Sequence, residues 1–356
     1  MKILAIETSC DETSVAIIEA QKNDHKVKIL ANFTASSLSL HAKTGGIIPE
    51  TAAREQIKYI LPVIEKVLNS IPGINNQNIQ KSIDAIAVTI GPGLIGSLLV
   101  GVETAKTLSY VWNKPIIPVN HLIGHIYANF VCKNKKQKLN TSDYLLKTEI
   151  EFPATVLVVS GGHTDLLLMK NHGKIIWLGG TRDDAAGEAF DKIGRILNLP
   201  YPGGPNIEIA ALKGNEKAIN FPRPLIKSDC LDFSFSGLKT AALREIQKKI
   251  LDEKNVEDIS ASVQKAIVDV LIKKTLKAAQ KYNTKSILLA GGVAANNKLR
   301  QQFELEIKNL KFKITLFAPE KWLCTDNAAM IGAAAFYTGK KTSWEKITTN
   351  PELYFN

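Results

Sequence analysis

Two histidines and a distant aspartate are the residues of this sequence best suited to binding a metal ion. His121 and His125 lie four positions apart in the stretch AsnHisLeuIleGlyHisIle, and on a helix this spacing brings both imidazoles to one face. Asp326 is the best third ligand, although an acid that opens a helix of small residues can also serve only as its N-cap. Two histidines and one carboxylate suit Fe(II), with Zn and Mn as alternatives. The competing interpretation of the histidine pair is two polar residues on a half-exposed helix.

An acidic turn near the start of the sequence is suited to handling protons or phosphate. Asp11 and Glu12 lie in the stretch IleGluThrSerCysAspGluThrSer, between strands predicted at 2–7 and 14–19. A carboxylate acts as a general base when it lies within hydrogen-bond reach of the proton it takes. Aspartate is also common in turns that have only a structural role. We predict a functional role because two acids stand together there.

Two apolar runs end in paired glycines and predict sites for an anionic ligand. The runs at 154–162 and 286–293 are predicted to be buried strands, because both faces of each are apolar. Glycine lets a ligand approach the backbone closely, and successive N–H groups in such a turn form an anion-binding nest. Asn296 follows the second turn at the start of a helix. It is placed to hydrogen-bond a ribose or a base, or to cap that helix.

Further polar segments lie between these two turns. The stretch 183–195 carries acids beside small residues, which would let another surface approach, or it forms a solvated helix face. TyrProGlyGlyPro at 201–205 is a rigid turn whose backbone can touch a ligand. The basic loops 223–227 and 234–239 predict contacts with an RNA backbone. The acids of the first stretch are Asp183, Asp184, Glu188 and Asp191.

The elements that must carry these residues alternate between strands and helices. Each half of the chain begins with a predicted hairpin and a third strand, followed by helices alternating with strands, and this similar order predicts a duplicated actin-like α/β fold with a central nucleotide cleft. An apolar rhythm predicts the core face of a helix at 49–70. That rhythm runs through Ile57, Ile60, Leu61, Ile64 and Leu68. Other helices are predicted at 94–112, 120–130, 185–198, 203–213, 237–250, 257–282, 295–309 and 326–338.

Composition and spacing set the domain boundaries and the class of protein. We predict a first domain at 1–131 plus 326–345 and a second at 150–325, separated by a Lys-rich insertion or linker at 132–149. The net charge of +11 is weak evidence for nucleic-acid binding, because only six of the 45 basic residues are arginine. The four scattered cysteines fit a reducing compartment. With no signal-peptide or membrane-spanning stretch, we expect a soluble cytoplasmic protein.

The long motifs together resemble one family, the tRNA N6-adenosine threonylcarbamoyltransferases, called TsaD in bacteria. The resemblance runs in order from residue 2 to about residue 338. It includes the acidic turn, the histidine pair, both glycine turns and the stretches HisAlaLysThrGlyGlyIleIleProGlu, AspAspAlaAlaGlyGluAlaPheAspLys, PheSerPheSerGlyLeuLys and CysThrAspAsnAlaAlaMetIle. It implies an actin-like fold and transfer of threonylcarbamoyl from threonylcarbamoyl-AMP to N6 of adenosine 37, in tRNAs that read codons beginning with adenine.

The resemblance also implies roles for single residues and for partners. His121, His125 and Asp326 match the metal ligands, and Asp11 and Glu12 match the acidic pair. Substrate-binding positions match Val158, Val159, Ser160, Gly161, Gly162, Asp191, Gly204, Glu208 and Asn296. The implied partners are tRNA, a TsaB-like paralogue and a TsaE-like ATPase, with the adenylate supplied by a TsaC-type synthase. An adenine nucleotide is expected as the bound adenylate or as ATP.

The sequence departs from the family pattern at three positions, and it leaves other functions to be weighed. Thr44 stands where an aromatic residue is common and Gln56 where histidine is common, and both are expected to affect contact with tRNA or a partner. Glu208 replaces an aspartate. A small-molecule kinase and a non-catalytic scaffold are the competing functions on this fold. A metalloendopeptidase is disfavoured because the sequence has no HExxH motif.

Overall fold

The computed structural model describes residues 1–21, 26–73, 78–132, 149–248, 252–310 and 312–355. The described chain divides into two compact units, residues 1–149 with 325–356 and residues 150–324. Most of the Lys-rich stretch predicted as an insertion lies outside the described residues. None of the described helices is long and apolar enough to span a membrane.

The first unit is built on a mixed sheet with the strand order β5-β4-β1-β2-β3-β6 among the described residues. β1, β2 and β3 pair antiparallel, while β4 adds to β1 and β5 adds to β4 in parallel. These strands are β1 (Lys2–Glu7), β2 (Glu12–Glu19), β3 (Val27–Ser36), β4 (Ala85–Gly91), β5 (Ile116–Asn120) and β6 (Val131–Cys132). The helices are α1 (Leu38–Thr44), α2 (Pro49–Asn69), α3 (Ile79–Ser82), α4 (Ile95–Trp112), α5 (His121–Tyr127) and α12 (Ala328–Thr338), with short 3-10 turns η1 (Ala128–Phe130) and η3 (Trp344–Lys346).

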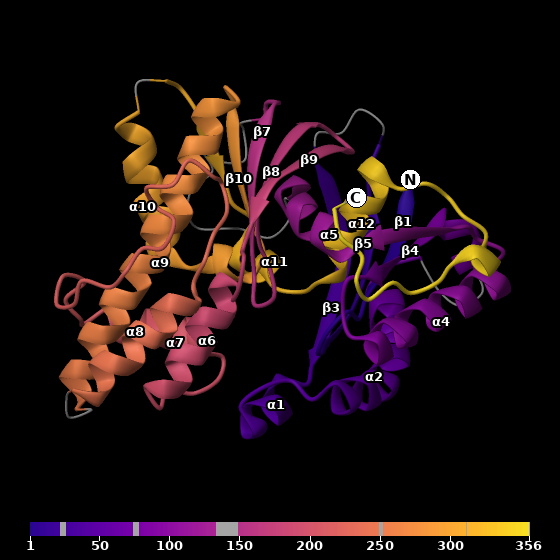
Figure 1. The fold of residues 1–356 in the computed structure, drawn as a ribbon. Coiled ribbons are helices and arrows are strands. Elements are labelled where there is room, and N and C mark those ends of the chain that lie inside the picture. Colours follow the sequence, from indigo (N-terminus) through magenta and orange to yellow (C-terminus); the bar gives the residue numbers. More distant parts are fainter. Residues whose placement is uncertain (22–25, 74–77, 133–148, 249–251, 311, 356) are drawn as a thin grey trace. The chain divides into compact units, whose positions relative to one another are not determined.

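Side-chain alternation explains why helices cover both faces of this sheet (Figure 1). Leu4 and Ile6 of β1 point to the face packed by α2 and α4. Ala5 points to the other face, where Gly332 of α12 lies against it and against Ile18. All of these strand side chains are fully buried. A strand that is apolar on both sides therefore predicts two helical layers.

The second unit repeats this arrangement. Its sheet has the order β11-β10-β7-β8-β9, in which β7, β8 and β9 pair antiparallel and β10 and β11 add in parallel to β7. The strands are β7 (Ala154–Val159), β8 (Thr164–Asn171), β9 (Lys174–Gly180), β10 (Ser286–Ala290) and β11 (Thr315–Phe317). The order β5-β4-β1-β2-β3 of the first unit is the same, strand for strand. The predicted duplicated actin-like fold is confirmed.

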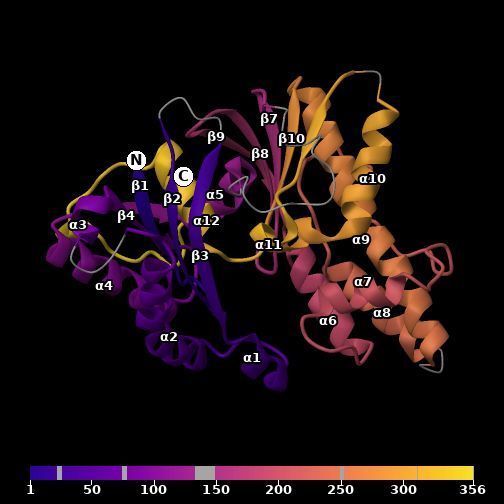
Figure 2. The ribbon, with the colours of Figure 1, turned by 180° about the vertical axis from the view of Figure 1, so that it is seen from behind.

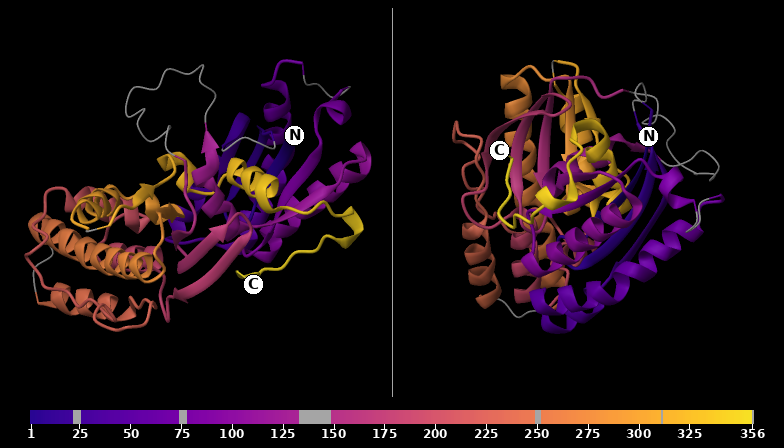
Figure 3. Two further views of the ribbon diagram at one scale, coloured as in Figure 1. Left: turned by 90° about the horizontal axis from the view of Figure 1, so that it is seen from above. Right: turned by 90° about the vertical axis from the view of Figure 1, so that its right-hand side faces the viewer.

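Helices of the second unit gather around a core of their own. The long helix α9 contacts α7, α8, α10 and β7, and it is seen along its length from above in Figure 3. The helices are α6 (Ala186–Ile196), α7 (Gly203–Ala211), α8 (Ser236–Gln247), α9 (Glu253–Lys281), α10 (Asn297–Lys308) and α11 (Lys321–Cys324), with the 3-10 turn η2 (Gly292–Ala295). Most predicted helices differ from these bounds only by a few residues at their ends.

One helix face was predicted wrongly. Within α2, Ile60 and Ile64 are buried as expected, but Ile57 is 64% exposed and Leu61 is 65% exposed. The buried face instead includes Gln56, Val63 and Val67. The helix carries two apolar stripes, so periodicity alone did not tell which of them faces the sheet. Figure 2 shows α2 at the edge of its unit, from the opposite side to Figure 1.

Candidate functional site

The histidine pair is positioned by the end of one strand and the start of one helix. β5 ends at Asn120, whose side-chain oxygen accepts hydrogen bonds from the backbone N–H groups of Leu122 and Ile123, at 2.8 and 3.2 Å. This N-cap starts α5 at His121 and places His125 one turn later. Both imidazoles are buried and their ring centroids lie 4.6 Å apart. The capped helix therefore presents both rings on one face, as the spacing predicted.

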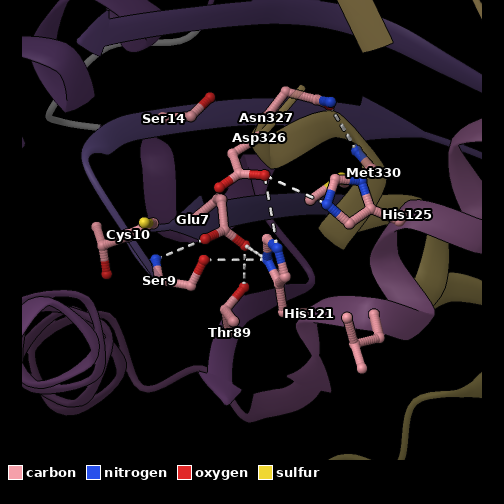
Figure 4. A network of polar contacts seen from close by, with 12 residues as sticks. Glu7, Ser9, Cys10, Ser14, Thr89, His121, His125, Asp326, Asn327 and Met330 are labelled. Carbon is pink, nitrogen blue, oxygen red and sulfur yellow. Dashed lines mark hydrogen bonds and ion pairs between the residues drawn. The ribbon is translucent and has the colours of Figure 1, made fainter. Parts of the chain in front are cut away.

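Asp326 is the third member of the cluster. Its side chain is free to face the histidines because the neighbouring residue caps the following helix. The N-cap of α12 is Asn327, whose side-chain oxygen accepts from Met330 N at 3.0 Å. The alternative of Asp326 as the cap is therefore wrong. Its Oδ1 atom lies 3.5 Å from His121 Nε2 and 3.3 Å from His125 Nε2 (Figure 4).

These three residues fit a single metal ion. One ligand atom from each lies within 4.8 Å of the others. Ligand bonds of about 2.0–2.2 Å at tetrahedral angles would separate the donor atoms by roughly 3.4 Å, which agrees with the two distances to the aspartate. Two imidazole nitrogens and one carboxylate oxygen leave coordination positions for water or substrate. The donor set therefore fits a divalent transition metal.

Glu7 holds His121 from behind, and sequence reasoning missed it. The carboxylate is fully buried, and its Oε2 lies 3.1 Å from His121 Nδ1. Thr89 Oγ1 donates to the same oxygen at 2.5 Å, and Ser9 N donates to the other oxygen at 2.6 Å. A carboxylate on the far nitrogen of a ligating histidine fixes the ring and raises its basicity. The available signal was a lone acid in an otherwise apolar strand, since such a charge needs a partner.

The acids and histidines shift one another's pKa values. Burial alone would lower the pKa of His121, but Glu7 and Asp326 together raise it to about 9. Burial alone would raise the pKa of Asp326, but the two histidines lower it to about 2. Burial raises the pKa of Glu12 to about 10, and repulsion from Asp326 and Asp11 adds to the rise. Negative charge is in surplus here, so a bound cation would relieve the repulsion.

Asp11 ends the acidic turn between β1 and β2, and Glu12 is the first residue of β2. Asp11 is 7% exposed, and its Oδ2 has no hydrogen-bond partner among the described residues. The side chain of Glu12 is hydrogen-bonded to Asp11. An unpaired buried carboxylate oxygen is costly to keep, so this atom is available to a ligand.

Both glycine turns of the second unit follow parallel strands that pair with each other. Ala290 of β10 is in register with Val158 of β7, so the two turns leave neighbouring strands at the same edge of the sheet. Gly291 has φ +88°, and a Cβ there would lie 2.5 Å from the carbonyl oxygen of Val159. Only glycine fits such a position without strain. The close approach of the second turn to the end of β7 thus depends on this residue.

The first turn leaves its glycine amides open. Ser160 N donates to His163 O at 2.8 Å, which closes the turn. Gly161 and Gly162 are exposed, nothing lies within 4 Å of a Cβ built on either, and their N–H groups donate no hydrogen bond within the described residues. These two amides are therefore open to the acceptor atoms of a ligand.

Other predicted ligand contacts already have partners in the protein. Asp191 Oδ1 accepts from Gly203 N at 2.7 Å and Gly204 N at 3.3 Å, at the start of α7. Asn296 caps α10 by accepting from Leu299 N at 2.9 Å, and its amide nitrogen donates to Gln264. Glu208 accepts from both the backbone and the side chain of Asn297, at 2.7 Å each. These bonds fix the loop ends, and only the remaining lone pairs and protons are open to a ligand.

Several acids and bases of the other predicted segments are also paired. Asp183 accepts four hydrogen bonds from Ser234, Phe235 and Ser236, which hold the loop before α8. Lys192 pairs with both Asp184 and Glu188. Within the basic loop 223–227, Arg223 is bound to Asp269 and to the carbonyl of Phe221.

The two unusual residues of the first unit make hydrogen bonds within the protein. Gln56 is only 1% exposed and donates to backbone carbonyls of the acidic turn. Any effect of Gln56 on contact with tRNA or a partner would therefore act through this turn, and it stays a prediction. Thr44 Oγ1 donates to the carbonyls of His41 and Gly46 and closes its own turn.

Comparison with known proteins identifies relatives along the whole chain. A family described as "TsaD: tRNA N6-adenosine threonylcarbamoyltransferase" matches residues 28–333. A tRNA N6-adenosine threonylcarbamoyltransferase of Moorella thermoacetica is 46% identical, covering 99% of this chain and 97% of its own. The enzyme of the same name from Thermosipho africanus is 48% identical, covering 96% and 95%.

A more distant likeness concerns the fold alone. The crystal structure of HypF from T. kodakarensis is similar with a TM-score of 0.58 at 13% identity, covering 94% of this chain. This chain spans 47% of that protein's length.

Proposed function

This chain belongs to the tRNA N6-adenosine threonylcarbamoyltransferase family, and we propose how its residues carry out the reaction of that family. The enzyme attaches threonylcarbamoyl to N6 of adenosine 37 in tRNAs that read codons beginning with adenine. The donor in our proposal is threonylcarbamoyl-AMP. The adenosine N6 forms a bond to the carbamoyl carbon, the bond from that carbon to the phosphate oxygen breaks, AMP leaves, and N6 gives up one proton.

The single observation that carries the proposal is the convergence of His121, His125 and Asp326 beside an acidic turn. These residues would hold one divalent cation, Fe2+ first, with Zn2+ and Mn2+ as alternatives. Such an ion supplies Lewis acidity for a carbonyl or phosphate oxygen when it is bound. Glu7 and Ser9 orient the ring of His121, since both lie 3.1 Å from its Nδ1.

Asp11 and Glu12 are the proposed catalytic residues for the proton of N6. Asp11 offers a buried carboxylate oxygen without a partner among the described residues. The side chain of Glu12, in contrast, is hydrogen-bonded to Asp11. Of the two, Asp11 is therefore the better acceptor, because its Oδ2 atom is free to take the proton.

The second unit supplies the proposed contacts to the donor. The open amides of Gly161 and Gly162 suit phosphoryl or acyl oxygens. They lie in the turn that begins at Ser160, directly after Val158 and Val159 of β7. Asp191, Gly204, Glu208 and Asn296 remain proposed substrate contacts on a smaller basis. Each would contact the donor through lone pairs or N–H groups that the hydrogen bonds described above do not use.

A paralogue of the same fold is the proposed protein partner. Ile57 and Leu61 of α2 lie one turn apart and are exposed, and so are Ile95 and Leu99 of α4. The two helices approach closely where Gly96 meets Ala53. Together these side chains form an apolar helical face, which a TsaB-like chain could match with its own equivalent helices. A TsaE-like ATPase and a TsaC-type synthase complete the proposed set, and a tRNA substrate implies a cytoplasmic location.

Reconstitution tests the proposed function. The chain, its proposed partners, unmodified tRNA and labelled threonylcarbamoyl-AMP are combined, and modified adenosine is measured after nuclease digestion. We expect product only when this chain is present. Product formed at the same rate without the chain would disprove the enzyme assignment, and ATP-dependent phosphorylation of a small molecule without tRNA would favour a kinase.

A further inference from the structure

One buried side chain connects α2 to the acidic turn. Gln56 Nε2 lies 3.2 Å from the carbonyl oxygen of Thr8, 2.9 Å from that of Cys10 and 3.0 Å from that of Glu12. These carbonyls belong to alternate residues along the segment that carries Asp11. A single amide group thus contacts the turn on both sides of that acid.

The chemistry of the amide fixes which end faces the turn. Three carbonyl oxygens can be faced only by a donor, so the nitrogen and not the oxygen lies there. Gln56 Oε1 is buried and has no hydrogen-bond partner among the described residues. An unpaired buried acceptor is unfavourable for folding. An apolar side chain would pack at this buried position without leaving an unpaired oxygen. The presence of glutamine is explained by the hydrogen bonds that its nitrogen donates to the three carbonyls.

Other donors also hold carbonyls of this turn. Ser37 donates to Asp11 O through its backbone N–H and its hydroxyl, at 3.2 and 2.9 Å. Leu94 N donates to Ser9 O at 2.8 Å, and Ser97 Oγ donates to Cys10 O at 3.0 Å. Of the carbonyls from Thr8 to Glu12, those of Thr8 and Glu12 receive a side-chain donor from Gln56 alone in the described part of the chain.

We propose that Gln56 is a positioning residue for Asp11 and Glu12. By holding the carbonyls that flank the pair, it keeps both carboxyl groups oriented during transfer. An amide carries two hydrogens on one nitrogen, so it can serve two carbonyls at once and a third by sharing. A neutral histidine in this place would have one N–H and could serve only one carbonyl. The proposal rests on the proposed function of the acid pair.

Substitution of Gln56 separates orientation from stability. Gln56→Met keeps the length of the side chain and removes the donor. We expect kcat to fall by at least about tenfold, since small displacements of catalytic groups cost this much. The KM for tRNA should stay within about twofold, because Gln56 is buried. The metal content should not change, since Gln56 contacts none of the three ligands. Gln56→His should recover part of the lost kcat.

A matched variant on the same helix controls for destabilisation. Val63→Ala removes a buried side chain of α2 that belongs to the core and makes no contact with the turn's carbonyls. We expect it to lower the melting temperature without lowering kcat. The proposal is overturned if Gln56→Met keeps kcat within about twofold of the parent, or if Val63→Ala loses as much. If Gln56→Met does not fold, Gln56→Asn, which keeps the amide but shortens its reach, is judged by the same criterion.

Two further variants separate this proposal from the one it rests on. If Asp11→Asn and Glu12→Gln both transfer at the parent rate, the role of the acid pair is wrong, whatever Gln56 does. If either of them is inactive while Gln56→Met is normal, only the positioning role of Gln56 fails.

Discussion

The two units offer a ligand very different surfaces. In the first unit the site consists of buried side chains, and several of them are fixed by a partner behind them, as Glu7 fixes His121. In the second unit the end of β7, the strand that corresponds to β1, carries two exposed glycines whose amides have no partner within the described residues. Fixed side chains suit chemistry that needs exact orientation, while open amides suit the binding of an anion. Substitutions should therefore reduce kcat and metal content in the first unit and donor affinity in the second.

Removal of a metal ligand should have the largest effect. Asp326→Ala takes away the carboxylate between the two histidines, and we expect the purified protein to lose its metal. Lewis acidity contributes several kcal/mol, so the transfer rate should fall by about a thousandfold. Metal analysis and the rate of adenosine modification measure the two effects. The neighbouring variant Asn327→Ala removes the cap of α12 and should cost about 1 kcal/mol of stability while keeping the metal. Equal metal content in the parent and Asp326→Ala would refute the assigned ligand.

Loss of the support behind the histidine should have a smaller effect. Glu7→Gln keeps the shape of the side chain but removes the charge that faces His121 Nδ1. Outer-shell changes of this kind reduce metal affinity or activity by about 10–100-fold, and titration with a competing chelator measures the affinity. Glu19→Gln, at the partly exposed end of β2 where Glu19 pairs with Lys2, is the matched control and should change nothing. Unchanged metal affinity in Glu7→Gln would mean that the contact has no role in the centre.

This contrast also explains which residues could be predicted from the sequence. The histidine pair was predictable because its spacing is local and the helix that carries it has a fixed period. The pairing of Glu7 with His121 spans 114 positions and leaves no spacing signal. Asp326 could be named but not distinguished from a cap, because Asp and Asn cap equally well and only the structure shows that Asn327 does so.

The fold was more predictable than the inward faces of its helices. Apolar runs ending in glycine or polar turns gave the strands, and the repeated order gave the duplication. In α2, however, the apolar rhythm placed Ile57 and Leu61 on the core face, and the structure exposes both of them while it buries Gln56. Burial of a polar residue depends on distant carbonyl groups, which periodicity does not reveal.

Two glycine variants of the second unit test whether its turns affect stability and donor binding without affecting the metal. Gly291→Ala must adopt φ +88° and would place its Cβ 2.5 Å from Val159 O, so we expect a loss of about 1–3 kcal/mol of stability. Gly161→Ala meets nothing within 4 Å and needs no unusual φ, so stability should change by less than about 0.5 kcal/mol. Its methyl group would still crowd the open amides, and the KM for the donor should rise about tenfold while metal content stays constant. An unchanged donor KM in Gly161→Ala would remove this turn from the binding site.

The smallest expected effect concerns a side-chain network of the second unit that we regard as structural. Partial burial alone would raise the pKa of Asp183, but hydrogen bonds from Ser234, Phe235 and Ser236 lower it overall. A lowered folded-state pKa adds stability that is complete above the unfolded value of 3.8 and is lost as the pH falls through the folded value. Asp183→Asn replaces the oxygen that accepts from the Ser234 and Ser236 hydroxyls with an amide donor. It should therefore cost about 1 kcal/mol near pH 6, as loss of a hydrogen bond does, and almost nothing near pH 2. Thermal unfolding across this range measures the difference, with Asp184→Asn as the control. A difference that does not shrink in acid would show that the charge of Asp183 does not hold the loop before α8. A large loss of kcat in the folded variant would instead give this network a part in the chemistry and weaken the distinction between the two units.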